Sequence, residues 1–152
     1  MTYKIFGLPT HILVIHLVVV GIPVAALLTV AMAARPRWRA GRIGLAIVLV
    51  DVLAVIGTWI ARESGEQFFN HQPGLRTLKP VIDHKNLGLT LIWYVLGMLL
   101  AALLLVLAEK YERPPLTTVF AIIATAVAIA AVVQTVRVGD AGARATWSGF
   151  IH

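Results

Sequence analysis

Long apolar runs dominate the chain and predict helices that cross a membrane. A helix needs about 20 apolar residues to span the hydrocarbon core of a bilayer. Four stretches meet that requirement, and their apolar residues are continuous where barrel strands would alternate. Because a spanning segment must satisfy its own backbone hydrogen bonds, we expect these stretches to be helical. The four helices are expected at residues 9–34, 43–62, 86–108 and 116–136.

The connections between these helices predict their arrangement. Two connections are short, so the first and second helices, and likewise the third and fourth, should be antiparallel neighbours. The simplest product is an all-α, up-down four-helix bundle that forms a single domain over residues 1–152. An outer loop is expected at 63–85 and an outer tail at 137–152, where glycines should end the last helix. We also expect Pro9 in the first turn of the first helix and Asp83 as the N-cap of the third.

Small residues on the fourth helix predict how it packs. In lipid, helices associate mainly through close contact of small side chains. Spacings that alternate between four and three residues place six small side chains on one helix face, which should meet a neighbouring helix. These residues are Thr117, Ala121, Ala124, Ala128, Ala131 and Thr135.

Basic residues predict the orientation of the bundle. The connection 35–42 carries four arginines and no acid, and the connection 109–115 adds Lys110 and Arg113. The positive-inside rule places both connections in the cytoplasm and both termini outside. We therefore expect a multi-pass protein of a bacterial inner membrane, with the lipid bilayer as its first partner.

Composition narrows the class of protein further. Hydrophobic residues make up 59% of the chain and charged residues 13%, against about 25% charged in a typical soluble domain. This excludes a disordered chain, a coiled coil and an ordinary soluble enzyme. The absence of cysteine excludes thiolate metal sites and a cysteine nucleophile. The net charge is +6. The basic residues that produce it are expected at the edges of the membrane, near anionic headgroups, so nucleic acid is not expected as a partner.

Histidines provide the main candidates for a cofactor site. His11, His16 and His84 all fall in the half of the bundle that we expect outside. Two histidines on different helices at similar depth can ligate a b-type haem, which predicts a pair of His84 with His16 or His11. A zinc or copper site made of His11, His84 and an outer acid is equally compatible, as is a quinone site.

Polar side chains form a stripe along the second helix. Asp51, Thr58 and Arg62 lie within about 20° of one helix face, and Glu66 continues the stripe if the helix extends that far. An ionisable group inside a membrane is costly and indicates function, so Asp51 is a candidate proton-relay or ligand-binding carboxyl. The plainer interpretation is a hydrogen bond between helices, to Gln134 or a threonine.

The tail after the fourth helix carries three charged residues, Arg137, Asp140 and Arg144. We expect them to form ion pairs with the outer loop, and we expect Trp147 at the level of the lipid headgroups. The candidate partners in the outer loop are Glu63, Glu66 and Asp83.

Several segments resemble a known family. They are residues 7–16, residues 63–66, His84 followed by Gly88, and residues 137–147. Together they resemble the family designated domain of unknown function 2231, with actinobacterial members the most similar. The resemblance covers nearly the whole chain and implies a bacterial four-helix inner-membrane protein without an established activity. Some relatives resemble fusions or neighbours of cytochrome c modules, which implies redox chemistry. Some members carry histidine where Asp140 stands here.

The chain has no motif of a hydrolase and no phosphate-binding glycine loop, so it is more consistent with a protein that has no catalytic activity of its own. Our leading expectation is a non-catalytic subunit of a larger respiratory or other electron-transfer complex, with other membrane subunits as partners. The alternative is a membrane redox protein that binds a b-type haem or a quinone in the outer leaflet.

Overall fold

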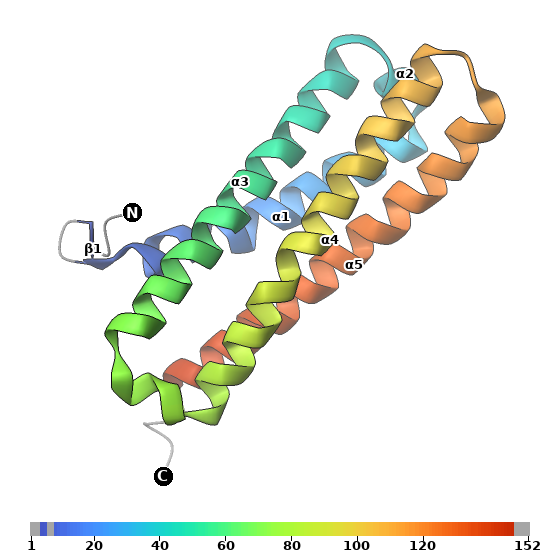
Figure 1. Cartoon of the computed structure of the whole chain (residues 1–152). Coiled ribbons are helices and arrows are strands. Elements are labelled where there is room, and N and C mark those ends of the chain that lie inside the picture. Colours follow the sequence, from blue (N-terminus) through green and yellow to red (C-terminus); the bar gives the residue numbers. More distant parts are fainter. Residues whose placement is uncertain (1–3, 6–7, 148–152) are drawn as a thin grey trace.

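The computed structural model describes residues 4–5 and 8–147 and consists almost entirely of helix (Figure 1). Two short strands, β1 (Lys4–Ile5) and β2 (Leu8–Pro9), pair antiparallel before the first helix. The long helices are α1 (Thr10–Ala34), α3 (Gly41–His71), α4 (Lys79–Lys110) and α5 (Pro114–Trp147). A short helix, α2 (Pro36–Arg39), joins α1 to α3, and a 3-10 helix, η1 (Pro73–Thr77), joins α3 to α4.

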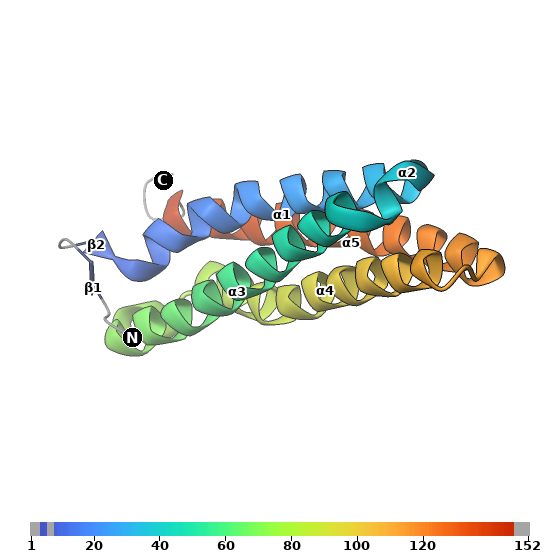
Figure 2. The same cartoon turned by 90° about the horizontal axis from the view of Figure 1, so that it is seen from above.

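The four long helices form the expected up-down bundle. Each packs against two neighbours in the cyclic order α1, α3, α4, α5, which leaves α1 and α4 at opposite corners. Viewed from above, the bundle has two layers, α1 with α5 and α3 with α4 (Figure 2). All four helices are long and apolar enough to cross a membrane. The prediction of an all-α, four-helix membrane protein is therefore confirmed.

Large apolar side chains cover much of the outer surface of the bundle, and small side chains form the buried face of α5. Leu17, Leu27 and Trp93 are each more than two-thirds exposed, which suits side chains that contact lipid. Of the six small residues predicted to face a neighbour of the last helix, five are fully buried and Ala121 is partly buried. This agrees with membrane bundles, in which small interfacial residues let helix backbones approach closely.

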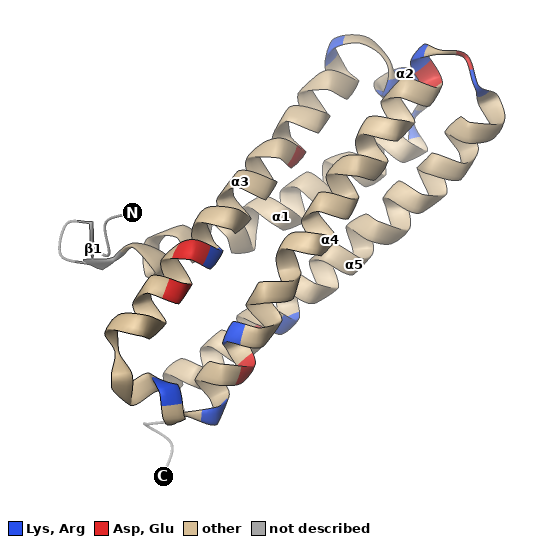
Figure 3. Ribbon diagram, in the orientation of Figure 1, with Lys and Arg blue, Asp and Glu red and all other residues tan. Residues whose placement is uncertain are grey.

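Polar residues in the middle divide the buried interior into two apolar clusters. One cluster centres on Ile22, Val95 and Met98, and the other on Met32 and Leu105. Along α1, Thr29 lies between residues of the two clusters, and along α3, Asp51 does. Both side chains are fully buried. Charged residues otherwise gather towards the two ends of the bundle (Figure 3).

The helices are longer than predicted, and this corrects both outer segments. The expected loop 63–85 is largely helical, because α3 continues to His71 and α4 already begins at Lys79. The expected tail is helical through Trp147, since α5 runs about 16 Å beyond residue 136 and includes Gly139 and Gly142. An increase in polarity along the sequence marks where a helix leaves the apolar layer. The helix itself continues for as long as its backbone hydrogen bonds and its packing against neighbouring helices persist.

Two predictions of helix ends were also wrong. Pro9 belongs to β2, and α1 begins one residue later, at Thr10. Leu78 occupies the N-cap position of α4, so Asp83 lies inside that helix, where its carboxylate pairs with Lys79 at 2.8 Å. The N-cap prediction failed because α4 begins several residues before the apolar run that located it.

Candidate functional site

Two histidines meet near the end of the bundle at which α1 begins. The ring centroids of His11 on α1 and His84 on α4 are 6.2 Å apart, and the ring planes are inclined by 67°. Because α1 and α4 occupy opposite corners of the bundle, the rings approach each other across its interior. Phe68 of α3 stacks on His11, with centroids 6.4 Å apart. We call His11 and His84 the histidine pair.

Each ring of the histidine pair is anchored to an adjacent helix through Nδ1. Nδ1 of His11 lies 3.0 Å from the carbonyl oxygen of Ala61 on α3, and Nδ1 of His84 lies 3.0 Å from that of Val138 on α5. A carbonyl oxygen only accepts, so Nδ1 carries a proton in both rings, and a neutral ring keeps a lone pair on Nε2. Within the part of the chain that the structure describes, neither Nε2 has a hydrogen-bond partner.

A glycine makes each anchoring contact possible. A Cβ added to Gly65 would lie 2.9 Å from Cε1 of His11, and a Cβ added to Gly142 would lie 3.0 Å from Cε1 of His84. In a helix the Cβ of a residue leans back over the preceding turn. A side chain four residues after the acceptor carbonyl would therefore cover that carbonyl and block the imidazole from reaching it.

The two anchors thus share one arrangement, a carbonyl followed four residues later by glycine. The carbonyl belongs to Ala61 in one anchor and to Val138 in the other, and the glycines are Gly65 and Gly142. Sequence reasoning missed these four residues. The signal was the presence of two glycines inside helices, where glycine costs about 1 kcal/mol relative to alanine and calls for a packing reason.

His16, expected as a ligand partner of His84, does not take part in this contact. Its side chain is exposed, and its Nδ1 lies 2.6 Å from the carbonyl oxygen of Ile12 on its own helix. Five residues of helix turn a side chain by about 140°. His11 and His16 therefore cannot both face the interior of the bundle, and the structure brings His11 to His84 instead.

The polar stripe of α3 lies along the bundle interior, but its members do not form one network. Asp51 and Thr58 are buried, and the Thr58 hydroxyl donates to the carbonyl of Ala54 one turn earlier. Arg62 and Glu66 are half-buried. Nε of Arg62 is buried and has no hydrogen-bond partner among the described residues.

Asp51 makes its contact with α1. The hydroxyl of Thr29 lies 3.0 and 3.2 Å from the two carboxylate oxygens. Of the two partner types expected for Asp51, the structure therefore provides the threonine. The other, Gln134, lies in a different place, because its amide nitrogen donates to the Leu87 carbonyl and the Thr90 hydroxyl on α4.

The charged residues at the end of α5 form local contacts. Arg144 pairs with Asp140 at 3.0 Å within α5, and Nη1 of Arg137 lies 3.3 Å from Oε1 of Gln134. The expected ion pairs with Glu63, Glu66 or Asp83 do not form. Because α5 stays helical here, i,i+4 neighbours are closer than residues of α3.

The described residues around the histidine pair do not include a set of ligands for a bare metal ion. Among the described residues, no three or more His, Asp or Glu side chains come close enough to hold a metal ion. A protein zinc site takes at least three protein ligands. Among the described residues, no acid joins His11 and His84 to complete the expected zinc or copper site.

Fold and site together define a membrane-spanning four-helix bundle with two anchored imidazoles facing each other near one end. The chain belongs to the family described as "Predicted membrane protein (DUF2231)", whose model matches residues 7–152. No curated protein matches the chain, and no solved structure does.

Proposed function

We propose that this chain is a membrane redox protein that holds a b-type haem between His11 and His84. The observation that carries the proposal is the facing pair of imidazoles, each anchored through Nδ1 and each with Nε2 unpartnered among the described residues. A hydrogen bond from the distal ring nitrogen to a carbonyl is the usual way in which a protein orients a metal-binding histidine.

The donor set fits haem better than a bare ion. Haem would need only two ligands from the protein, which is the number that the histidine pair offers. Bound haem would supply one-electron transfer.

The surrounding residues position the two rings. The carbonyls of Ala61 and Val138 set the direction of each imidazole, and Gly65 and Gly142 leave room for it. Arg62 directly follows Ala61, and its Nε, which has no partner among the described residues, is a donor available to a carboxylate group. These features support a site built around the two histidines and give no role to His16.

A non-catalytic subunit of a respiratory complex is the competing proposal. It rested on the absence of a catalytic signature in a small four-helix chain, and it predicted that Asp51 faces protein. Asp51 is shielded inside this chain's own bundle and bonded by Thr29, so it requires no partner. A quinone site at the same histidines is the other competitor, since an unprotonated Nε2 can accept a proton from a quinol.

We also propose that the protein lies in a bacterial inner membrane with the arginine-rich end in the cytoplasm. The connection 35–42 and the turn after α4 lie at one end of the bundle, and the start of α1 and the end of α5 lie at the other (Figure 3). His11 is the second residue of α1, so the histidine pair belongs to this second end. Positive charge concentrated in short connections favours the cytoplasmic side. Both termini would then be outside.

An optical spectrum tests the haem proposal. The full chain, purified in mild detergent from cells supplied with a haem precursor, should show a Soret band and reduced α and β bands. His11→Ala and His84→Ala should lose these bands, whereas His16→Ala should keep them. Wild-type protein without a Soret band, or equal loss in all three variants, would overturn the proposal. Quinone found in a solvent extract of haem-free protein would favour the quinone site.

A further inference from the structure

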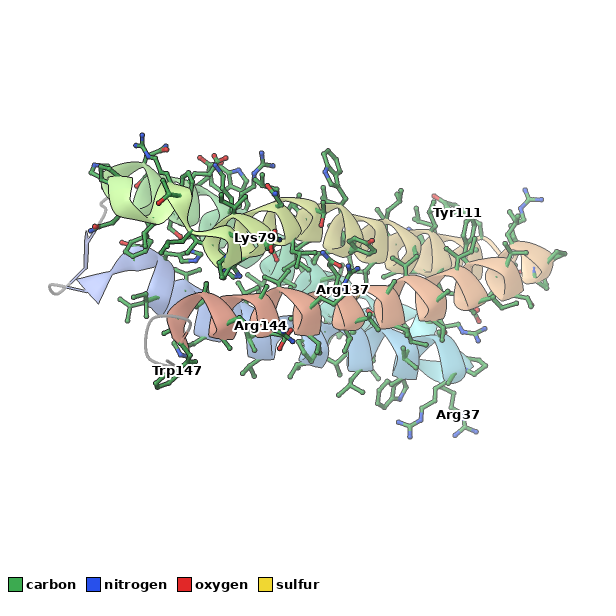
Figure 4. All side chains as sticks on the ribbon, turned by 90° about the horizontal axis from the view of Figure 1, so that it is seen from below. Arg37, Lys79, Tyr111, Arg137, Arg144 and Trp147 are labelled. Carbon is green, nitrogen blue, oxygen red and sulfur yellow. The ribbon has the colours of Figure 1, made fainter. Side chains whose placement is uncertain are left out.

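A charged groove lies between α4 and α5, and its lining does not include either residue of the histidine pair. It runs between the first turns of α4 and the last turns of α5 and has a volume of about 680 Å³. Lys79 of α4 and Arg137 and Arg144 of α5 lie along the border between these helices (Figure 4). Leu87 and Ala141 add apolar surface to its lining.

Two of the three cations in this groove already have carboxylate partners. Lys79 pairs with Asp83 at 2.8 Å, and Arg144 pairs with Asp140 at 3.0 Å. Both acids also line the groove. Arg137 differs, because its guanidinium reaches no carboxylate among the described residues and meets only the Gln134 amide oxygen, at 3.3 Å. The groove therefore contains one net positive charge, located on Arg137.

The position of Arg137 along α5 indicates which class of molecule supplies the negative charge that neutralises its guanidinium. Val133 and Val136, just before it, are more than half exposed, as expected for side chains in contact with acyl chains. Arg137 is itself exposed and is the first charged residue after the apolar run of α5. An arginine at the edge of the hydrocarbon layer extends towards the lipid phosphates, and a guanidinium donates two parallel hydrogen bonds to a phosphate.

We propose that this groove binds one monoanionic phospholipid with a hydroxyl-bearing headgroup, of the phosphatidylglycerol type. The phosphate would bind Arg137, and the headgroup hydroxyls would donate to Asp83 and Asp140. One negative charge neutralises the groove, whereas a zwitterionic lipid would leave Arg137 uncompensated. The proposal does not depend on the haem proposal, because none of the residues that line the groove belongs to the histidine pair.

Lipid retention tests this proposal. The full chain is incubated with mixed vesicles of phosphatidylglycerol and phosphatidylcholine, extracted and washed in mild detergent, and the lipid that stays bound is measured by mass spectrometry. Arg137→Gln removes the charge and the paired donors, and should weaken phosphatidylglycerol binding at least about tenfold, equivalent to about 1.4 kcal/mol. Arg144→Gln should weaken it less, because Arg144 already has a carboxylate partner.

The matched control is Arg37→Gln, which removes the same charge from an exposed arginine of α2 at the other end of the bundle. It should retain phosphatidylglycerol like the wild type. Equal loss in Arg37→Gln and Arg137→Gln would overturn the proposal, as would wild-type protein that retains phosphatidylcholine as strongly as phosphatidylglycerol. Displacement of the lipid by inorganic phosphate alone would show a site for free anions and would also overturn it.

Discussion

The hydroxyl of Thr29 on α1 lies within hydrogen-bond distance of both carboxylate oxygens of Asp51 on α3, at 3.0 and 3.2 Å. Both side chains are fully buried, so water cannot replace this contact. The pair lies between two apolar clusters of the interior. It therefore links α1 to α3 where the two helices are otherwise held by apolar packing.

Thr29→Val should destabilise the bundle more than its change in volume suggests. It keeps the shape of the side chain but leaves the Asp51 carboxyl without its donor, which costs about 1–3 kcal/mol. Unfolding in detergent, followed by circular dichroism, measures the loss. Thr118→Val is the control, because Thr118 is exposed and bonds only the carbonyl of Pro114 on its own helix. Equal stability of the two variants would contradict a role for the contact.

Gly142→Ala should disturb the histidine pair. Its new Cβ would lie 3.0 Å from the His84 ring, so the ring must move away from the carbonyl of Val138. If haem binds as proposed, we expect a weaker and shifted Soret band. Gly139→Ala is a close control in the same helix, because a Cβ there meets nothing within 4 Å. Identical spectra for the two variants would argue against the anchoring role of the glycine.

Gly44→Ala should destabilise the connection between α2 and α3. The added Cβ would lie 2.6 Å from the backbone oxygen of Arg39, and backbone cannot yield as a flexible side chain can. Gly57→Ala, in the same helix, places its Cβ at an ordinary 3.6 Å from Val18 and should gain about 0.5–1 kcal/mol from higher helix propensity. Thermal denaturation of both variants measures the contrast. A destabilised Gly57→Ala beside an unaffected Gly44→Ala would contradict it.

The absence of cysteine makes the orientation directly testable. Single cysteines placed at Ala40 and Tyr111 mark the arginine-rich end, and cysteines at Thr77 and Thr146 mark the other end. All four sites are exposed, and none of the changes alters charge. A membrane-impermeant maleimide should label positions 77 and 146 in intact cells, and positions 40 and 111 only after permeabilisation. The reverse pattern would invert the proposed orientation.

Much of the fold could be predicted from the apolar pattern, because bilayer thickness and backbone hydrogen bonding constrain it strongly. The four spans and the small-residue face of the last helix follow from that pattern. The ends of the helices do not, since polarity reports only where a helix leaves the apolar layer. This is why an irregular loop at 63–85 and an irregular tail at 137–152 were predicted, whereas the loop is largely helical and the described part of the tail, 137–147, is helical.

The candidate site was predicted only in part. His11 and His84 were both among the candidates, but His16 seemed the better partner because it lies deeper in the apolar run. Only the rotation of α1 about its axis distinguishes His11 from His16, and that rotation depends on packing against α3 and α5.

The sequence by itself therefore determined that the chain has four membrane-spanning segments and that His11, His16 and His84 lie towards one end. The tertiary structure decided which histidines face each other, because His11 reaches the carbonyl of Ala61 only where Gly65 leaves room, and His84 reaches that of Val138 only where Gly142 does. These contacts join residues 50 and 54 positions apart. Apolar periodicity predicts which face of a helix is buried. The contacts of the histidine pair depend in addition on which neighbouring helix that face meets and on how far along its axis they meet.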